Sequence, residues 1–313
     1  MHELVAHLEQ HFPLRIAHIA PAARGLVAET FVVTDHDQQR WFVKCCRNPL
    51  FKAHVVASAA GHQAIAQALP ALINAPLAPH SGHGVSCWGT TIVSVSQFID
   101  APLTEQYDTG VFGRLIGHVH QCTPQIQAPL ERIAEFSHDA LWRHLWQQAI
   151  AGESAPWQRE LASALRPYQA LVATHYRTLI HLQARAPHHP HPWVVTHGDA
   201  GGNVIGHDDD HLTLIDWDYI GLAHPERDLW VFQFDERFWS GYRSVVGAYP
   251  RQQFQLDLAA FRQYFDYMVY ILSEIYAPTC TDQARIAHID NLLSLFDERN
   301  WIQPHLRSSL SSA

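Results

Sequence analysis

The chain has 313 residues, of which 47% are apolar and only 16% are charged. This composition excludes an intrinsically disordered protein, because disorder requires low hydrophobicity together with high charge. The 21 basic and 30 acidic residues give a formal net charge of −9, so a nucleic-acid partner is not expected. The length suits two domains or one large domain.

The cysteines and the N-terminal region indicate where the protein resides. Five cysteines without a C-x-x-C pattern offer neither a zinc ribbon nor a redox motif, and they favour a reduced, intracellular chain. Residues 1–20 predict an amphipathic helix and a strand rather than a secretory signal. Residues 53–99 contain no Asp, Glu, Lys or Arg, but His, Gln and Pro interrupt every apolar run before it could span a membrane. We therefore expect a cytoplasmic protein with no membrane partner.

The first hundred residues are rich in predicted strands. The β-branched and aromatic runs 31–33 and 41–43 flank a polar turn, which predicts a hairpin. Residues 54–69 have apolar side chains at helical spacing, and Pro70 ends the pattern. A further strand is expected over 90–99. These elements together predict a small sheet accompanied by a helix.

The character of the chain changes after residue 110. Long helical patterns recur over 139–150, 157–184 and 255–276. Short strands are expected over 193–196 and 211–215. A boundary near residue 100 would therefore separate a β-rich lobe from a mostly helical one, and ligand sites commonly lie between such lobes.

The stretch 197–203, His-Gly-Asp-Ala-Gly-Gly-Asn, carries the most chemical information. Asp199 follows a predicted strand and a glycine, so its carboxylate can accept a proton from a hydroxyl nucleophile and orient it. Asn203 lies across a glycine-rich turn and Asp216 ends the next predicted strand, and their oxygens are ligands that suit Mg²⁺. An isolated His-Gly-Asp is more often a plain turn. The ordered set instead provides the base and metal ligands that phosphoryl transfer from a nucleotide requires.

The pattern His-Gly-Asp-x-x-x-Asn at 197–203, followed by Ile-Asp-Trp-Asp at 215–218, resembles the signature of the aminoglycoside phosphotransferase and choline kinase superfamily. The Pro-Glu-Arg-Asp-Leu segment at 225–229 resembles that family's Pro-x-x-Asp-Leu. The resemblance implies an α+β, bilobal, protein-kinase-like fold. Residues 1–100 would form a nucleotide-binding lobe, and residues 101–313 a mostly helical catalytic and substrate-binding lobe.

The resemblance also implies roles for individual residues. Asp199 would be the catalytic base, and Asn203 and Asp216 would hold Mg²⁺. His197 would support the loop through hydrogen bonds. Asp228 would brace the same loop by pairing with backbone or with a basic residue.

The N-terminal lobe fits the same plan with one departure. Lys44 ends a predicted strand and resembles the family lysine that contacts the nucleotide phosphates, and Gly25 lies in the hairpin that would cover them. Kinase-like folds pair this lysine with a carboxylate from the next helix. Because residues 53–99 hold no acid, His62 and Gln63 are the nearest polar candidates. Otherwise Lys44 is held by another group, or only when nucleotide is bound.

The remaining predicted contacts concern the purine and the acceptor. Phe98 and Ile99 resemble the linker that binds adenine, so they are candidates to flank the base of ATP, with GTP as the alternative. The acceptor site in this family is acidic or aromatic. Candidates for it are Asp218, Trp230, Asp235, Glu236, Trp239 and Glu274.

The sequence therefore predicts an ATP-dependent phosphotransferase that modifies a hydroxyl of a small, cationic molecule. An aminoglycoside or aminocyclitol antibiotic is the favoured acceptor, with a role in antibiotic resistance. One alternative is a metabolite kinase that acts on choline, ethanolamine, homoserine or a sugar. Another is a non-catalytic nucleotide-binding pseudokinase, which the missing helix acid suggests. The oligomeric state is left open.

Overall fold

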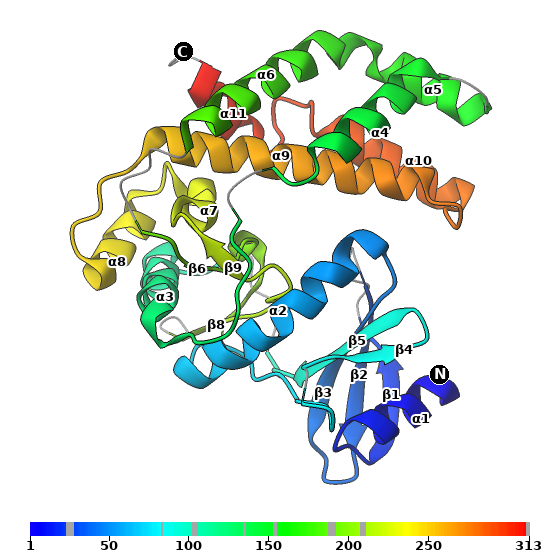
Figure 1. The fold of residues 1–313 in the computed structure, drawn as a ribbon, viewed down its shortest axis with the longest axis vertical. Coiled ribbons are helices and arrows are strands. Elements are labelled where there is room, and N and C mark those ends of the chain that lie inside the picture. Colours follow the sequence, from blue (N-terminus) through cyan, green and yellow to red (C-terminus); the bar gives the residue numbers. More distant parts are fainter. Residues whose placement is uncertain are drawn as a thin grey trace. The chain divides into compact units, whose positions relative to one another are not determined.

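A computed structural model describes residues 1–22, 28–82, 84–101, 106–133, 136–152, 155–186, 192–206 and 211–310 (Figure 1). Its strands are β1 (Ile16–Pro21), β2 (Glu29–Asp35), β3 (Arg40–Cys46), β4 (Ser86–Trp88), β5 (Thr91–Gln97), β6 (Val194–Thr196), β7 (Val204–Gly206), β8 (Leu212–Leu214) and β9 (Gly221–Ala223). Its helices are α1 (His2–His11), α2 (Pro49–Ala68), α3 (Thr109–Gln121), α4 (Asp139–Ala151), α5 (Pro156–Leu165), α6 (Gln169–Arg185), α7 (Glu226–Leu229), α8 (Glu236–Val246), α9 (Gln253–Tyr276), α10 (Asp282–Ser294) and α11 (Gln303–Leu310).

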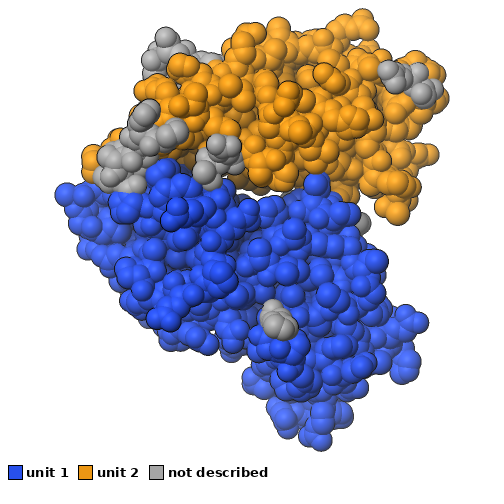
Figure 2. All heavy atoms as spheres, viewed as in Figure 1, with its two compact units in different colours: residues 1–133, 192–228, 235–249 blue, residues 134–191, 229–234, 250–313 orange. Residues whose placement is uncertain are grey.

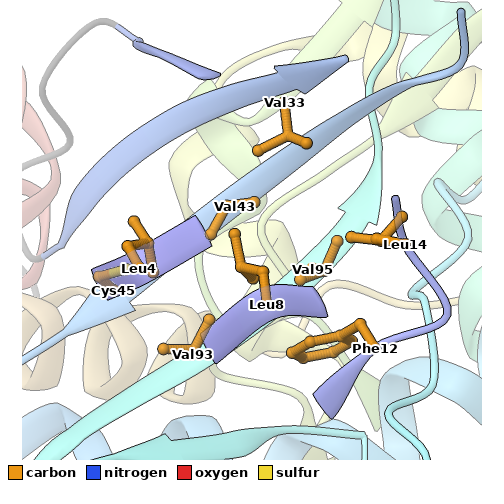
Figure 3. Packing of buried hydrophobic residues seen from close by; sticks show 9 residues of the cluster. All are labelled: Leu4, Leu8, Phe12, Leu14, Val33, Val43, Cys45, Val93 and Val95. Atoms are coloured by element: carbon orange, nitrogen blue, oxygen red, sulfur yellow. The ribbon is translucent and has the colours of Figure 1, made fainter. Parts of the chain in front are cut away.

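The N-terminal strands form an antiparallel sheet in the order β1-β2-β3-β5-β4. Side chains alternate between the two faces of such a sheet. On one face, Leu4 and Leu8 of α1 and Phe12, which directly follows this helix, form a core with Val43 and Val95 (Figure 3). This packing explains the amphipathic pattern at the N-terminus, because the apolar face of α1 is the cover of the sheet.

The opposite face of the sheet meets α2. Cys46 and Ile92 from the sheet pack with Val55 and Ala59 from this helix. Lys44 is two residues before Cys46 on β3, so the strand alternation directs it to the same face as α2. The sheet therefore places the lysine on the side that faces away from the α1 core.

Most predicted elements are present, with three informative differences. Helix α2 begins at Pro49 rather than 54, because the Asn48 side chain accepts a hydrogen bond from Leu50 N and caps the helix. The helix expected over 157–184 is two helices, α5 and α6, separated by a turn that contains Pro167. Among the three-residue strands, β6 and β8 were predicted and β4, β7 and β9 were not, because so short a run carries too little periodicity to distinguish a strand from a loop.

The chain divides into two units by its internal contacts (Figure 2). One comprises residues 1–133, 192–228 and 235–249, and the other residues 134–191, 229–234 and 250–313. The first contains the five-stranded sheet and the segment 197–218. The two-lobe boundary near residue 100 stays a prediction. Within the described ranges, no helix has the length and hydropathy required to cross a bilayer.

Buried histidines make the stability depend on pH. Burial lowers the pKa of His62 on α2, His175 on α6 and His305 on α11 to about 4 in each case. The unfolded chain therefore binds protons that the folded chain does not between about pH 6.5 and 4. The stability that these three histidines contribute is consequently complete above this window and is lost as the pH falls through it.

We expect the free energy of unfolding to fall by about 2 kcal/mol per such histidine between pH 7 and pH 5. Urea unfolding of the wild type at both pH values, beside His175→Gln, measures this. His175 is only 1% exposed and lies edge-on to Phe261 and Tyr264, so the variant should lose its share of the pH dependence. His181→Gln on the exposed face of α6 is the matched control. Equal pH dependence in wild type and His175→Gln would contradict the prediction.

Candidate active site

Lys44 is held by two aspartates from a distant part of the chain. Its Nζ donates to Asp216 Oδ1 and, at 2.9 Å, to Asp218 Oδ2. Burial alone would lower the pKa of Lys44, but the two carboxylates raise that pKa above its ordinary value. The lysine therefore stays charged although it is buried. His62 is not its partner, because His62 Nε2 bonds to Asn74 O at 2.9 Å.

The loop between β6 and β7 holds Asp199 through its neighbours. The Asn203 amide donates to Asp199 O at 2.8 Å and to Asp199 Oδ2 at 3.1 Å. The Asp199 N–H donates to His197 Nδ1 at 3.2 Å, and His197 Nε2 bonds to Ile215 O at 2.8 Å. His197 thus joins the loop to the strand end that carries Asp216. Burial raises the pKa of the Asp199 carboxyl, the direction that favours proton acceptance.

Asp216 has an unusual backbone conformation. Its φ of 64° lies in the left-handed region, which non-glycine residues seldom adopt and which is often found at functional sites. Burial opposes its ionisation, but Lys44 keeps the pKa of Asp216 below the usual range. Asp216 is therefore present as a carboxylate.

Asn203 and Asp216 suit a magnesium ion chemically. The Asn203 amide nitrogen is engaged by Asp199, which leaves the amide oxygen for a metal, and Asp216 offers an anionic oxygen. Magnesium commonly takes one or two protein ligands and completes its shell with water and substrate phosphates. Within the described ranges, no three His, Cys, Asp or Glu side chains are grouped to hold a metal by themselves. A metal shared with a nucleotide fits this donor set better than a resident one.

A single buried carboxylate fixes the loop to two helices. Asp228, 2% exposed, accepts hydrogen bonds from the backbone N–H groups of His197 at 2.8 Å and Gly198 at 2.7 Å. His120 on α3 lies 3.2 Å from the same carboxylate and contacts the hydroxyl of Tyr242 on α8 at 2.8 Å. Asp228 therefore acts as an anchor for the backbone just before Asp199.

Gly198 is required by its surroundings. Its φ is +88°, and a Cβ there would overlap the guanidinium of Arg227. Arg227 is itself fixed, since it donates to Thr196 Oγ1 at 2.7 Å and to Tyr219 O at 2.9 Å. A side chain at position 198 must therefore displace either Arg227 or the loop that carries Asp199.

We expect Gly198→Ala to lower kcat by about 100-fold, since a displacement of about 1 Å in a catalytic group can have this effect. Gly202→Ala is the matched control in the same loop, because a Cβ there has no described atom within 4 Å. Steady-state kinetics and urea unfolding of both variants measure the effect. Comparable kcat values for the two variants would contradict this role of Gly198.

The predicted nucleotide contacts lie in different surroundings. Phe98 and Ile99 follow β5 and are both half-buried. The centre of the Phe98 ring lies 4.0 Å from the Arg40 guanidinium. The backbone N–H of Phe98 donates to Arg40 O at 3.1 Å. Gly25 lies outside the described residues. Contact of these three residues with a nucleotide stays a prediction.

The six predicted acceptor contacts are distributed over both units. Asp218 lies beside Lys44, and Asp235 caps α8 by accepting from Phe238 N at 3.0 Å. Trp239 is fully buried, Trp230 is 6% exposed, Glu236 is exposed and Glu274 is half-buried. Asp218, Asp235, Glu236 and Trp239 belong to the first unit, whereas Trp230 and Glu274 belong to the second. Their roles toward an acceptor stay predictions.

Two residues of the site were missed in the sequence. Ser58 on α2 donates to Asp218 O at 2.6 Å, and Arg227 makes the contacts described above. Serine inside a helix carries no motif, so only the spatial contact identifies it. Arg227 lies in the Pro-Glu-Arg-Asp-Leu segment, where the recognised pattern specifies only the proline, aspartate and leucine.

The paired lysine on β3, the loop that carries Asp199 and the carboxylate at Asp216 all belong to the first unit. The phosphotransferase enzyme family matches residues 18–264, so the chain belongs to this family. The α+β, bilobal, protein-kinase-like fold is thereby confirmed. No curated protein sequence matches the chain.

Solved structures with the same fold have low sequence identity to this chain. A spectinomycin phosphotransferase with ADP and spectinomycin has a TM-score of 0.74 at 16% identity, over 99% of this chain and 98% of that one. An amicoumacin kinase with AMP-PNP has a TM-score of 0.65 at 11% identity, over 97% of this chain and 95% of that one. A microcompartment-associated aminopropanol kinase has a TM-score of 0.63 at 15% identity, over 99% of this chain and 98% of that one. These likenesses establish the fold, and two of the three structures contain a nucleotide.

Proposed function

We propose that this phosphotransferase moves the γ-phosphoryl group of ATP to a hydroxyl of a small molecule. The observation that carries the proposal is the set formed by Lys44, Asp199, Asn203 and Asp216 within one unit. A pseudokinase reading gains no support from the missing helix acid, because Lys44 has carboxylate partners from elsewhere.

Each of these residues has one task. Asp199 orients the acceptor hydroxyl and receives its proton at the carboxylate, which burial makes more basic. Lys44 contacts the phosphates from β3, and the Asn203 and Asp216 oxygens would hold Mg²⁺. The ion, when bound, neutralises charge on the β- and γ-phosphates. His197 and Asp228 keep the Asp199 backbone in place.

For the acceptor we propose an aminoglycoside or aminocyclitol antibiotic, and with it a role in resistance and a cytoplasmic location. The acidic chain suits a polycation, and a spectinomycin phosphotransferase shares the fold over almost the whole chain. A metabolite kinase is the second candidate, favoured by the likeness to an aminopropanol kinase.

The test is ADP release from Mg²⁺-ATP with a panel that includes the aminocyclitol spectinomycin, aminoglycosides, aminopropanol, choline, homoserine and neutral sugars. Stimulation by one antibiotic class, absent in Asp199→Asn, would support both parts of the proposal. Stimulation by a metabolite alone would overturn the antibiotic assignment. Nucleotide binding without transfer to any member of a broad panel would favour the non-catalytic alternative.

A further inference from the structure

Helix α2 lacks the group that a kinase-like fold requires from it. Its residues Pro49–Ala68 are all described, and they include no Asp or Glu. Lys44 nevertheless lies on the sheet face that α2 covers, since Cys46 on the same face packs with Val55 and Ala59. A carboxylate that positions Lys44 must therefore come from another part of the chain.

The segment 217–219 lies along one face of α2. The Trp217 ring stacks on His62 with centroids 6.2 Å apart, and Ser58, 4% exposed, donates to Asp218 O at 2.6 Å. Tyr219 contacts the rings of His54 and Phe51 at 5.6 and 6.0 Å. Positions 51, 54, 58 and 62 are three or four residues apart, so they share one face of the helix.

The carboxylate of this same segment reaches the lysine. Asp218 Oδ2 accepts from Lys44 Nζ at 2.9 Å, and both side chains are largely buried. Asp216 also pairs with Lys44, but Asp216 is in addition the proposed metal ligand. Asp218 therefore contacts the lysine through its carboxylate and α2 through its backbone carbonyl oxygen.

We propose that Asp218 replaces the helix carboxylate of kinase-like folds as the positioning residue for Lys44, and that α2 acts on the lysine through the Ser58–Asp218 hydrogen bond. The role is exerted on the nucleotide side of the reaction, so it differs from acceptor binding by Asp218. The inference rests on the proposed function for its kinetic consequence, but the position of Lys44 can be measured without turnover.

The chain contains only two lysines, Lys44 and Lys52, which permits a direct measurement. Both are labelled competitively with a small amine-directed reagent at pH 9 in nucleotide-free protein, and mass spectrometry gives the Lys44/Lys52 ratio. Asp218→Asn should raise this ratio about tenfold, because loss of the charged hydrogen bond to Asp218 frees Lys44 Nζ to reach the reagent. Ser58→Ala removes one neutral hydrogen bond and should raise the ratio about threefold. Gln67→Ala on the exposed side of α2 should leave it unchanged.

Binding and kinetics provide the second measurement. Asp218→Asn and Ser58→Ala should each raise the Kd for Mg²⁺-ATP about fivefold or more and leave the KM of the acceptor unchanged. An unchanged labelling ratio in Asp218→Asn, or an effect on acceptor KM alone, would overturn the proposal. A raised ratio in Asp218→Asn with none in Ser58→Ala would overturn the link to α2.

Two variants of Ser58 distinguish a loss of the hydrogen bond from a loss of folded protein. Alanine favours helices, so Ser58→Ala is expected to fold even where Asp218→Asn does not. Ser58→Thr keeps the hydroxyl and should retain the wild-type ratio; equal ratios for the alanine and threonine variants would contradict the proposal. Because the labelling contains no acceptor, a raised ratio supports the positioning of Lys44 even if no panel member is phosphorylated.

Discussion

Asp199→Asn is expected to lower kcat by about 10²- to 10⁴-fold, the range over which a general base contributes to catalysis. The asparagine keeps the size of the side chain but cannot accept the proton of the acceptor hydroxyl. The backbone hydrogen bonds around position 199 do not involve its side chain and should persist. KM for the nucleotide should change little, since the residues proposed to contact phosphates and metal are unaltered.

Steady-state kinetics with saturating acceptor and a separate titration of nucleotide binding measure these two effects. Equal losses in kcat and kcat/KM would indicate an interaction made only in the transition state. A kcat within tenfold of wild type would contradict the assignment of Asp199 as the base. Urea unfolding of the variant at pH 7 controls for a loss of folded protein.

Local patterns in the sequence predicted the elements and chemical groups that depend on neighbouring residues. The spacing of apolar residues over 54–69 predicted α2, and the ordered motif at 197–203 predicted the loop now found between two strands. Both depend on contacts within a few residues along the chain. The family resemblance implied that Asp228 braces the loop by pairing with its backbone. Its carboxylate does accept hydrogen bonds from the N–H groups of His197 and Gly198.

Features that depend on distant contacts could not be predicted in this way. The ion pairs of Lys44 connect it to carboxylates that lie 172 and 174 positions further along the chain. No local pattern in the sequence shows which carboxylate reaches the lysine. Helix α8 packs closely on α3, and its Trp239 is fully buried. Gly113 and Gly241 permit this approach, because a Cβ on either would overlap backbone of the other helix. The glycines were visible in the sequence, but the pairing of their helices was not.

Asp216→Asn should lower kcat/KM by about 10³-fold, because metal stabilisation of the transferring phosphates contributes several kcal/mol. The variant removes the anionic metal ligand while it keeps the backbone feasible, since asparagine also tolerates the left-handed conformation found at 64°. Lys44 retains Asp218 as a partner, so the buried ammonium is not left unpaired. The loss should therefore reflect the metal rather than collapse of the site.

A titration of activity with Mg²⁺ at fixed ATP separates these causes. The variant should require a much higher concentration of Mg²⁺ for half-maximal activity, and urea unfolding without metal measures the stability lost with the Lys44–Asp216 ion pair. Asp100→Asn is the control, because Asp100 also pairs with a cation of the same unit, Arg40, but is 83% exposed. A surface ion pair of this kind contributes at most about 1 kcal/mol, so the control should retain activity. Wild-type kcat/KM and Mg²⁺ dependence in Asp216→Asn would show that the metal is held elsewhere.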